Sequence, residues 1–261
     1  MIACSGSPSE TPDDAVVVAE PAQHGALDLS LLAEVAEVDR SMVAPTAEET
    51  RLAVEKAGLG SLGKRVPERN YRLDVPDKDR VALRTGVLLA DTVLSVRDTD
   101  PKKLAAMLRD VQTGMRTLEA DPQVVDTLGE LAGQLDNDSI TRDDLLKTLD
   151  EATSDVRDEM GGHGRFVQAG AWLAGSNLVA GAVLESGDPS SATALLSQPD
   201  VAEYYLDYVR SEAGKEKAGA DIAEALEDTL ATLLELSGKS ELTLEDVGVI
   251  QKKTQDILDL I

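Results

Sequence analysis

Hydrophobic residues recur along most of this chain at intervals of three and four, the spacing that places side chains on one face of an α-helix. In the segment 123–135 the apolar positions are Val124, Val125, Leu128, Leu131 and Leu135. Alternation of apolar and polar residues never lasts more than a few positions, and 15–19 is the only candidate strand. The pattern therefore predicts an all-α fold, a helical bundle.

Capping residues and prolines mark where the helices begin and end. Thr46 and Glu49 have the spacing of a capping box, which predicts a helix start at 47. Pro101 and Pro122 each follow an aspartate, an arrangement that ends one helix and starts the next. We expect helices at 47–57, 80–97, 102–118, 123–135, 142–159, 190–197, 200–213, 217–237 and 244–260.

The segment 164–184 is the centre of the predicted bundle. It contains no charged residue from Phe166 to Leu184, and many of its residues are glycine or alanine. It is long enough to span a bilayer, but Gln168, Ser176 and Asn177 make it a poor membrane segment. We expect a buried central helix, with a membrane span as the alternative.

A weaker copy of this segment lies at 80–96. When Gly86 is aligned with Gly170, Leu89, Ala90 and Leu94 meet Leu173, Ala174 and Leu178. Downstream, Asp126 precedes Thr141 by the same spacing with which Asp228 precedes Thr243. The pattern predicts an internal duplication with pseudo-twofold symmetry, its units about 80–160 and 164–261, the second carrying an insertion near 199–216.

Composition and charge exclude several classes of function. The chain has 261 residues and a net charge of −24, so it lacks the basic surface that nucleic acid requires, and we expect no nucleic acid partner. Aromatic residues make up only 2%, which suits a core of leucine, valine and alanine in helices. One cysteine and two histidines leave no disulfide or multi-histidine metal site, and we expect neither metal nor cofactor. Because no catalytic constellation can be assembled, we expect that the protein is not an enzyme.

The N-terminal residues MIACSGSPSE carry a possible lipid attachment site. Ile2, Ala3 and Cys4, followed by Ser5, resemble the end of a bacterial lipobox, and acid- and proline-rich residues follow. We expect a lipid on Cys4, a flexible tether over 1–26 and a single bundle domain over 27–261. No basic and apolar signal region stands before Cys4 in this sequence, and the upstream reading frame would show whether one is encoded there. Serine after the cysteine favours the outer membrane, facing the periplasm. The alternative is an ordinary cysteine on a cytoplasmic terminus.

Asp91 is the sharpest candidate for a functional side chain, because it interrupts the apolar helix 80–97. A buried carboxylate must be paired, hydrogen-bonded or protonated. We expect Arg84, two turns earlier, or a hydroxyl group to be its partner. Fixing helix packing and binding a ligand or cation both remain open as its role. The loop 58–79 holds a cluster of basic residues: Lys64, Arg65, Arg69 and Arg72. We expect these residues to form salt bridges with nearby acids, and the alternative is that they bind an anion.

Three short motifs together resemble an uncharacterised family of α-helical bacterial lipoproteins. They are Gly86-Val87-x-x-Ala90-Asp91, Asn137-Asp138-Ser139 and Gly170-Ala171-Trp172-Leu173-x-Gly175, and they cover about 80–180. In that family an acidic residue follows the Trp-apolar pair, whereas this chain has Ala174. The resemblance implies an all-α fold and an address in the cell envelope, and no activity.

These observations lead to an expected function. We expect a non-enzymatic binding or scaffold protein of the bacterial envelope, attached to the membrane only by its lipid, whose partner is an unknown envelope protein or small ligand. The alternative is a small-molecule or cation binder with a site between the two central helices, formed by Asp91, Arg84, Trp172 and Asn177.

Overall fold

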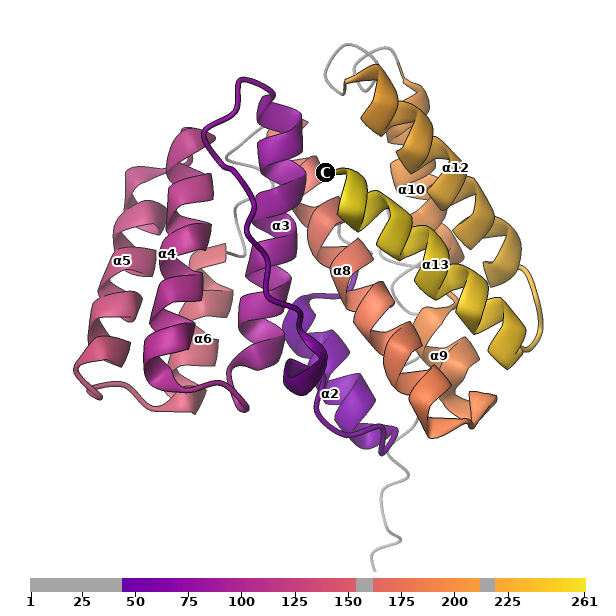
Figure 1. The fold of residues 1–261 in the computed structure, drawn as a ribbon, viewed down its shortest axis with the longest axis horizontal. Coiled ribbons are helices and arrows are strands. Elements are labelled where there is room, and N and C mark those ends of the chain that lie inside the picture. The colour runs from indigo at the N-terminus through magenta and orange to yellow at the C-terminus, as the bar shows by residue number, and fades with distance from the viewer. Residues whose placement is uncertain (1–43, 154–161, 212–218) are drawn as a thin grey trace, which may run out of the picture. The chain divides into compact units, whose positions relative to one another are not determined.

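The described part of the chain consists of α-helices and the segments that connect them (Figure 1). The computed structural model describes residues 44–153, 162–211 and 219–261, all within one unit, Asp39–Ile261. Cys4, the predicted tether and its boundary at residue 26 lie outside the described residues. The prediction of an all-α bundle is confirmed, since the described ranges contain no β-strand. The helices are α2 (Ala47–Lys56), α3 (Lys78–Ser95), α4 (Pro101–Thr117), α5 (Pro122–Asp136), α6 (Arg142–Thr153), α8 (Gly162–Ser186), α9 (Ala192–Leu196), α10 (Pro199–Arg210), α12 (Ala220–Ser237) and α13 (Leu244–Leu260), with 3-10 turns η2 (Gly63–Arg65) and η3 (Pro189–Ser191).

Side-chain caps set the starts of several helices. The capping box before α2 is present: Thr46 Oγ1 accepts from the Glu49 main-chain N–H at 3.1 Å, and the Glu49 carboxylate accepts from the Thr46 N–H at 2.8 Å. Asp100 and Asp121 cap α4 and α5, whose first residues are prolines, as predicted. Helix α3 begins two residues earlier than expected because the Asp77 side chain caps it.

Helices α3 and α8 lie side by side in the middle of the bundle and make its most extensive helix contact (Figure 1). They run parallel and in register, since Asp79 in the first turn of α3 contacts His163 in the first turn of α8. Although α8 is long and apolar enough to cross a membrane, 72% of its most apolar window is buried inside the bundle. The prediction of a buried central helix is confirmed.

Two glycines allow the main chains of α3 and α8 to touch. A Cβ atom on Gly86 would lie 2.7 Å from the carbonyl carbon of Val167 and closer still to its oxygen. A Cβ on Gly170 would lie 3.0 Å from the carbonyl carbon of Leu83, again closer to the oxygen. The contact is reciprocal, because each glycine faces the residue three positions before the other glycine. Locally, α3 and α8 are therefore related as the two halves of a twofold interface are.

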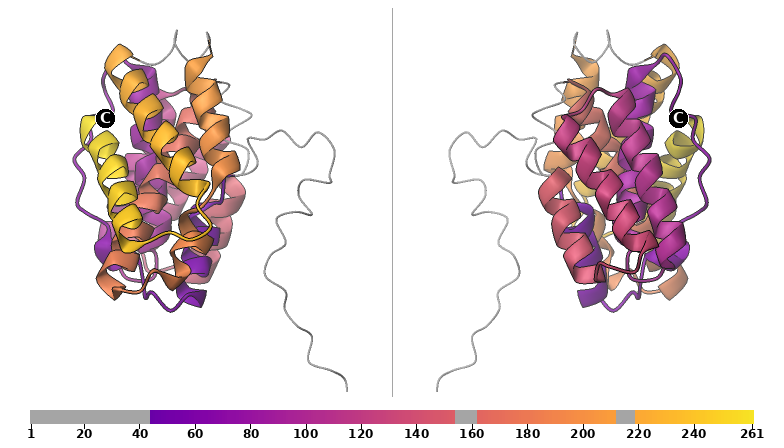
Figure 2. Two further views of the ribbon diagram at one scale, coloured as in Figure 1. Left: turned by 90° about the vertical axis from the view of Figure 1, so that its right-hand side faces the viewer. Right: turned by 90° about the vertical axis from the view of Figure 1, so that its left-hand side faces the viewer.

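Two groups of helices flank this pair on opposite sides, as the views in Figure 2 show. On one side α4 packs on α5 and α5 on α6; on the other α10 packs on α12 and α12 on α13. The sides differ in the helix that covers the centre, which is chiefly α4 for α3 and α13 for α8. The internal duplication predicted from the sequence thus finds support in the order of packing and in the glycine contact, but not in the covering helices, and it stays a prediction.

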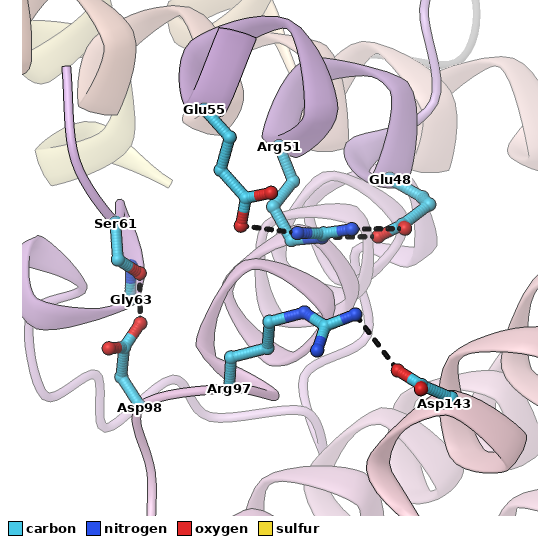
Figure 3. Close-up of polar contacts among 8 residues, drawn as sticks. All are labelled: Glu48, Arg51, Glu55, Ser61, Gly63, Arg97, Asp98 and Asp143. Atoms are coloured by element: carbon cyan, nitrogen blue, oxygen red, sulfur yellow. Dashed lines mark hydrogen bonds and ion pairs between the residues drawn. The ribbon is translucent and has the colours of Figure 1, made fainter. Parts of the chain in front are cut away.

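Helix α2 packs against α3, α8 and α9 while burying a charged residue. Arg51 is only 5% exposed, and it donates to the carboxylates of Glu48 at 2.6 and 2.7 Å and of Glu55 at 2.5 Å, both on its own helix (Figure 3). Below it in the same view, Arg97 reaches Asp143 of α6. Because α2 satisfies its own buried guanidinium, it needs no charged partner from the helices beneath it.

The loop after α2 approaches the end of α3 closely. The Ser61 hydroxyl donates to the Asp98 carboxylate, and a Cβ on Gly63 would meet the main chain of Ser95 at 3.0 Å (Figure 3). From there the segment 66–77, called the strap below, leads to the start of α3 and carries Arg69, Tyr71 and Arg72.

Candidate functional site

Asp91 lies on α3 with its side chain only 2% exposed, and its partner is Arg69 of the strap. The Arg69 Nε–H donates to Asp91 Oδ2 at 2.5 Å. The expected pairing with Arg84 is wrong. Arg84 instead donates to the main-chain oxygen of Ile261 at 3.0 Å from Nε and 2.5 Å from Nη2, and from Nη1 to that of Arg72. Arg84 therefore joins the strap to the end of α13, and Asp91 pairs instead with Arg69, which the strap places over α3.

Tyr71 connects the strap to α13. Its hydroxyl donates to the Leu258 carbonyl at 3.0 Å and accepts from Arg69 Nη1 at 3.1 Å. The guanidinium groups of Arg69 and Arg84 lie 5.8 and 5.6 Å from the centre of its ring, within the range of cation–π attraction. One tyrosine thus holds together the strap, α3 and α13.

Burial governs the electrostatics of this cluster. Desolvation raises the pKa of Asp91 to about 6, although the charge and hydrogen bond of Arg69 act in the opposite direction. Burial lowers the pKa of Arg69, but the charges and hydrogen bonds of Asp91 and Tyr71 together outweigh it, and the net shift is upward. Burial also raises the pKa of Tyr71. The pair is therefore an ion pair at neutral pH whose carboxylate takes up a proton under mildly acidic conditions.

The Arg69–Asp91 contact leaves one atom unsatisfied on each side. Arg69 Nη2 and Asp91 Oδ1 are buried and have no hydrogen-bond partner among the residues that the structure describes. Nη2 stands beside Nε on one edge of the guanidinium group, so a small rotation of the arginine would turn the single bond into a bidentate pair. The cluster therefore holds an unused donor and an unused acceptor, each at an energetic cost while it stays unpaired.

A pocket of about 220 Å³ opens next to the pair. Its lining residues are Arg69, Asn70, Tyr71, Leu88 and Asp110. Leu88 is the apolar part of the wall, and polar groups make up most of the rest. The volume is below that of a typical drug-sized site, so an occupant would be a molecule of few heavy atoms. Asp91 itself does not line the pocket; it lies behind Arg69 and fixes that side chain.

Trp172 and Asn177 are in other parts of the bundle. The Trp172 indole N–H donates to Gln198 Oε1 at 2.5 Å, and its ring lies 5.8 Å from that of Tyr205. The Asn177 amide donates to the Gln251 carbonyl and to Thr254 Oγ1, both at 3.0 Å, and joins α8 to α13. The structure brings Asp91 and Arg84 together around Tyr71, but Trp172 and Asn177 contribute to neither the pocket nor the ion pair.

A histidine–aspartate contact joins the first turns of α3 and α8. His163 Nδ1 is 2.8 Å from Oδ1 of the buried Asp79, and Arg165 lies 4.9 Å from the centre of the Tyr208 ring. Burial raises the pKa of Tyr208. The described residues contain no group of three or more histidine, cysteine, aspartate or glutamate side chains placed to hold a metal ion. We assign the pair to helix docking, since it joins the two central helices where they begin.

Sequence reasoning located part of the site. The basic loop was recognised, and its salt bridges are present: Arg65 with Glu185, Arg69 with Asp91 and Arg72 with Asp74. Tyr71, Asn70 and Asp110 were missed. A tyrosine amid arginines could have marked the first, but no local pattern marks Asp110, the single acid of α4, as part of a pocket. No family model, curated protein or solved structure matches this chain.

Proposed function

We propose that this is a non-enzymatic binding protein of the bacterial cell envelope, held at the membrane by a lipid on Cys4, that takes up a small polar molecule in the Arg69 pocket. The pocket, with the buried ion pair behind it, is the observation that carries the proposal. Arg69 is held in the wall by Asp91 and Tyr71, so this part of the wall has its shape before a ligand arrives. A polar group whose position is fixed in advance loses little entropy when a ligand binds to it.

The proposal places the ligand at a different point from the one expected from the sequence. The pocket lies over α3 and the strap, with Leu88 and Asp110 in its wall, and not between α3 and α8, where the two main chains touch at Gly86 and Gly170. A scaffold role with an envelope protein as partner is the second candidate. Trp172 and Asn177, expected in the ligand site, both serve packing inside the bundle.

A thermal-shift screen of small polar compounds tests the pocket. A ligand at about one hundred times its dissociation constant stabilises the folded state by about 2.7 kcal/mol, which raises the melting temperature by several degrees. Asn70→Trp fills the pocket from an exposed position without removing an internal contact, and it should abolish the shift. Gln123→Trp, on the exposed start of α5, is the matched control and should keep it. A hit that persists in Asn70→Trp binds elsewhere and contradicts the proposal.

The envelope address has its own test. The gene is expressed from its full upstream reading frame in bacteria fed an alkyne fatty acid, and the protein is examined for the label. The wild type should carry the label and fractionate with the outer membrane, while Cys4→Ser should lose both. An unlabelled, soluble wild type would support the alternative of a cytoplasmic protein, whatever the pocket binds.

A further inference from the structure

Asp110 is the one charged group in the pocket wall without a partner among the described residues. Arg69, the other charged lining residue, is neutralised by Asp91 behind it. Arg109, the neighbour of Asp110 in sequence, pairs with Asp136 and not with Asp110. Partial burial raises the pKa of Asp110, and no ion pair among the described residues opposes that shift. The pocket therefore presents an uncompensated carboxylate on a chain whose net charge is −24.

The rest of the wall determines what this carboxylate can bind. The Asn70 side-chain amide has no partner among the described residues, so its carbonyl oxygen is free to accept a second hydrogen bond. Leu88 is only 6% exposed and adds a small apolar patch to the wall, enough for contact with a short carbon chain. A calcium or magnesium ion needs about six oxygen ligands, and a single carboxylate with one amide falls well short of that number. An ammonium group needs only two or three acceptors.

We propose that the pocket binds a small primary amine, whose ammonium group is held by the Asp110 carboxylate and the Asn70 amide oxygen while its alkyl part covers Leu88. This inference rests on the proposed function of the pocket and names its ligand class. The negative charge of the whole chain raises the local concentration of cations and favours their approach. A pocket of about 220 Å³ admits an amine of only a few heavy atoms.

The test is an amide-resolved NMR titration of the intact, ¹⁵N-labelled chain at low salt with three probes of matched size. These are n-butylammonium, 1-butanol and butyrate, which differ only in the charge and type of the polar group. We expect n-butylammonium to shift the amides of the pocket with a dissociation constant on the order of millimolar, and the other two to leave them in place. Physiological salt should weaken the binding.

Two variants fix the assignment to Asp110. Asp110→Asn should weaken n-butylammonium binding by about tenfold or more, because a charge-assisted hydrogen bond becomes a neutral one. Asp150→Asn, at an exposed acid on α6, removes the same charge from the chain and should leave the affinity unchanged. Equal binding by the wild type and Asp110→Asn would overturn the inference.

The outcomes separate the ligand class from the pocket. If butyrate or butanol shifts the pocket amides as strongly as the amine does, the pocket binds small molecules but the amine inference is wrong. If the shifts from n-butylammonium spread evenly over the acidic surface and persist in Asn70→Trp, the amine inference is overturned as well. If no probe and no compound of the thermal-shift screen affects the pocket, the proposed function falls together with the inference.

Discussion

Adding one methyl group at Gly86 should drive the two central helices apart. The alanine Cβ would lie 2.9 Å from the Ala171 nitrogen and 2.7 Å from the Val167 carbonyl carbon, whereas real Cβ contacts essentially never fall below 3.0 Å. The obstacle is the main chain of α8, which cannot rotate away as a side chain can. Gly86→Ala therefore requires α3 and α8 to separate along their most extensive contact.

The expected loss follows from two opposing effects. Overpacking a core typically costs about 1–3 kcal/mol, and a main-chain obstacle over a long contact belongs at or above the top of that range. Alanine gains about 1 kcal/mol over glycine in a helix interior. We expect a net destabilisation of about 2 kcal/mol or more, which for a chain of this size lowers the melting temperature by about 4–8 °C or more.

Gly133→Ala is the matched control, because it makes the same substitution in α5 where a Cβ would meet nothing within 4 Å. It should raise the free energy of unfolding by about 0.5–1 kcal/mol through helix propensity alone. Urea unfolding is followed by circular dichroism and by the fluorescence of Trp172, the single tryptophan, which is buried on α8. Equal stability of the two variants would refute the close approach of α3 and α8.

Three further predictions concern charged groups. Arg69→Met leaves Asp91 buried without its cation, so it should lower the free energy of unfolding by about 3 kcal/mol at neutral pH. The loss should be clearly smaller at about pH 4.5, where Asp91 is protonated. A loss that does not depend on pH would contradict the pairing. Because the pKa of Asp91 rises from 3.8 to about 6 on folding, the folded state holds an extra proton between these values, and stability from this group falls as pH rises through that window. Asp91→Asn should remove this slope from melting temperatures measured across the window, and an unchanged slope would argue against the burial of Asp91. Hydrogen bonds from Lys239 and Thr243 lower the pKa of Asp246 to about 2. The stability that this carboxylate contributes is therefore present above pH 3.8 and lost as the pH falls towards 2. The destabilisation by Asp246→Asn, measured in denaturation series at decreasing pH, should shrink over the same range.

The sequence predicted the helices well because their signals are local. Capping residues such as Thr46 and the Asp-Pro pairs at 100–101 and 121–122 act within a single turn, so their effect can be recognised without knowledge of the fold. The uncharged segment 164–184 could only be stable if other helices covered it, and its likeness to 80–96 indicated which helix would lie beside it. The glycines then explain how closely the two approach.

The partners of the polar residues could not be predicted in this way. Whether Asp91 pairs with Arg84 or Arg69 depends on the path of the strap, and Tyr71 fixes that path through a contact with Leu258, 187 positions away. Asn177 likewise finds Thr254 across 77 positions. No local sequence pattern predicts contacts between residues so far apart along the chain. The pocket at Asp110 forms where α3, α4 and the strap meet, so the sequence of no single segment predicts it.

The strap has a consequence for how the chain is completed during synthesis. The Arg69–Asp91 pair joins residues 22 positions apart and can form as soon as α3 has left the ribosome. The bonds from Tyr71 to Leu258 and from Arg84 to Ile261 span 187 and 177 positions, so they must wait for the last turn of α13. Until then α8 lacks the helix that covers it, and its apolar surface is open to chaperones. Among the described contacts of the strap, these two bonds therefore form after the Arg69–Asp91 pair can.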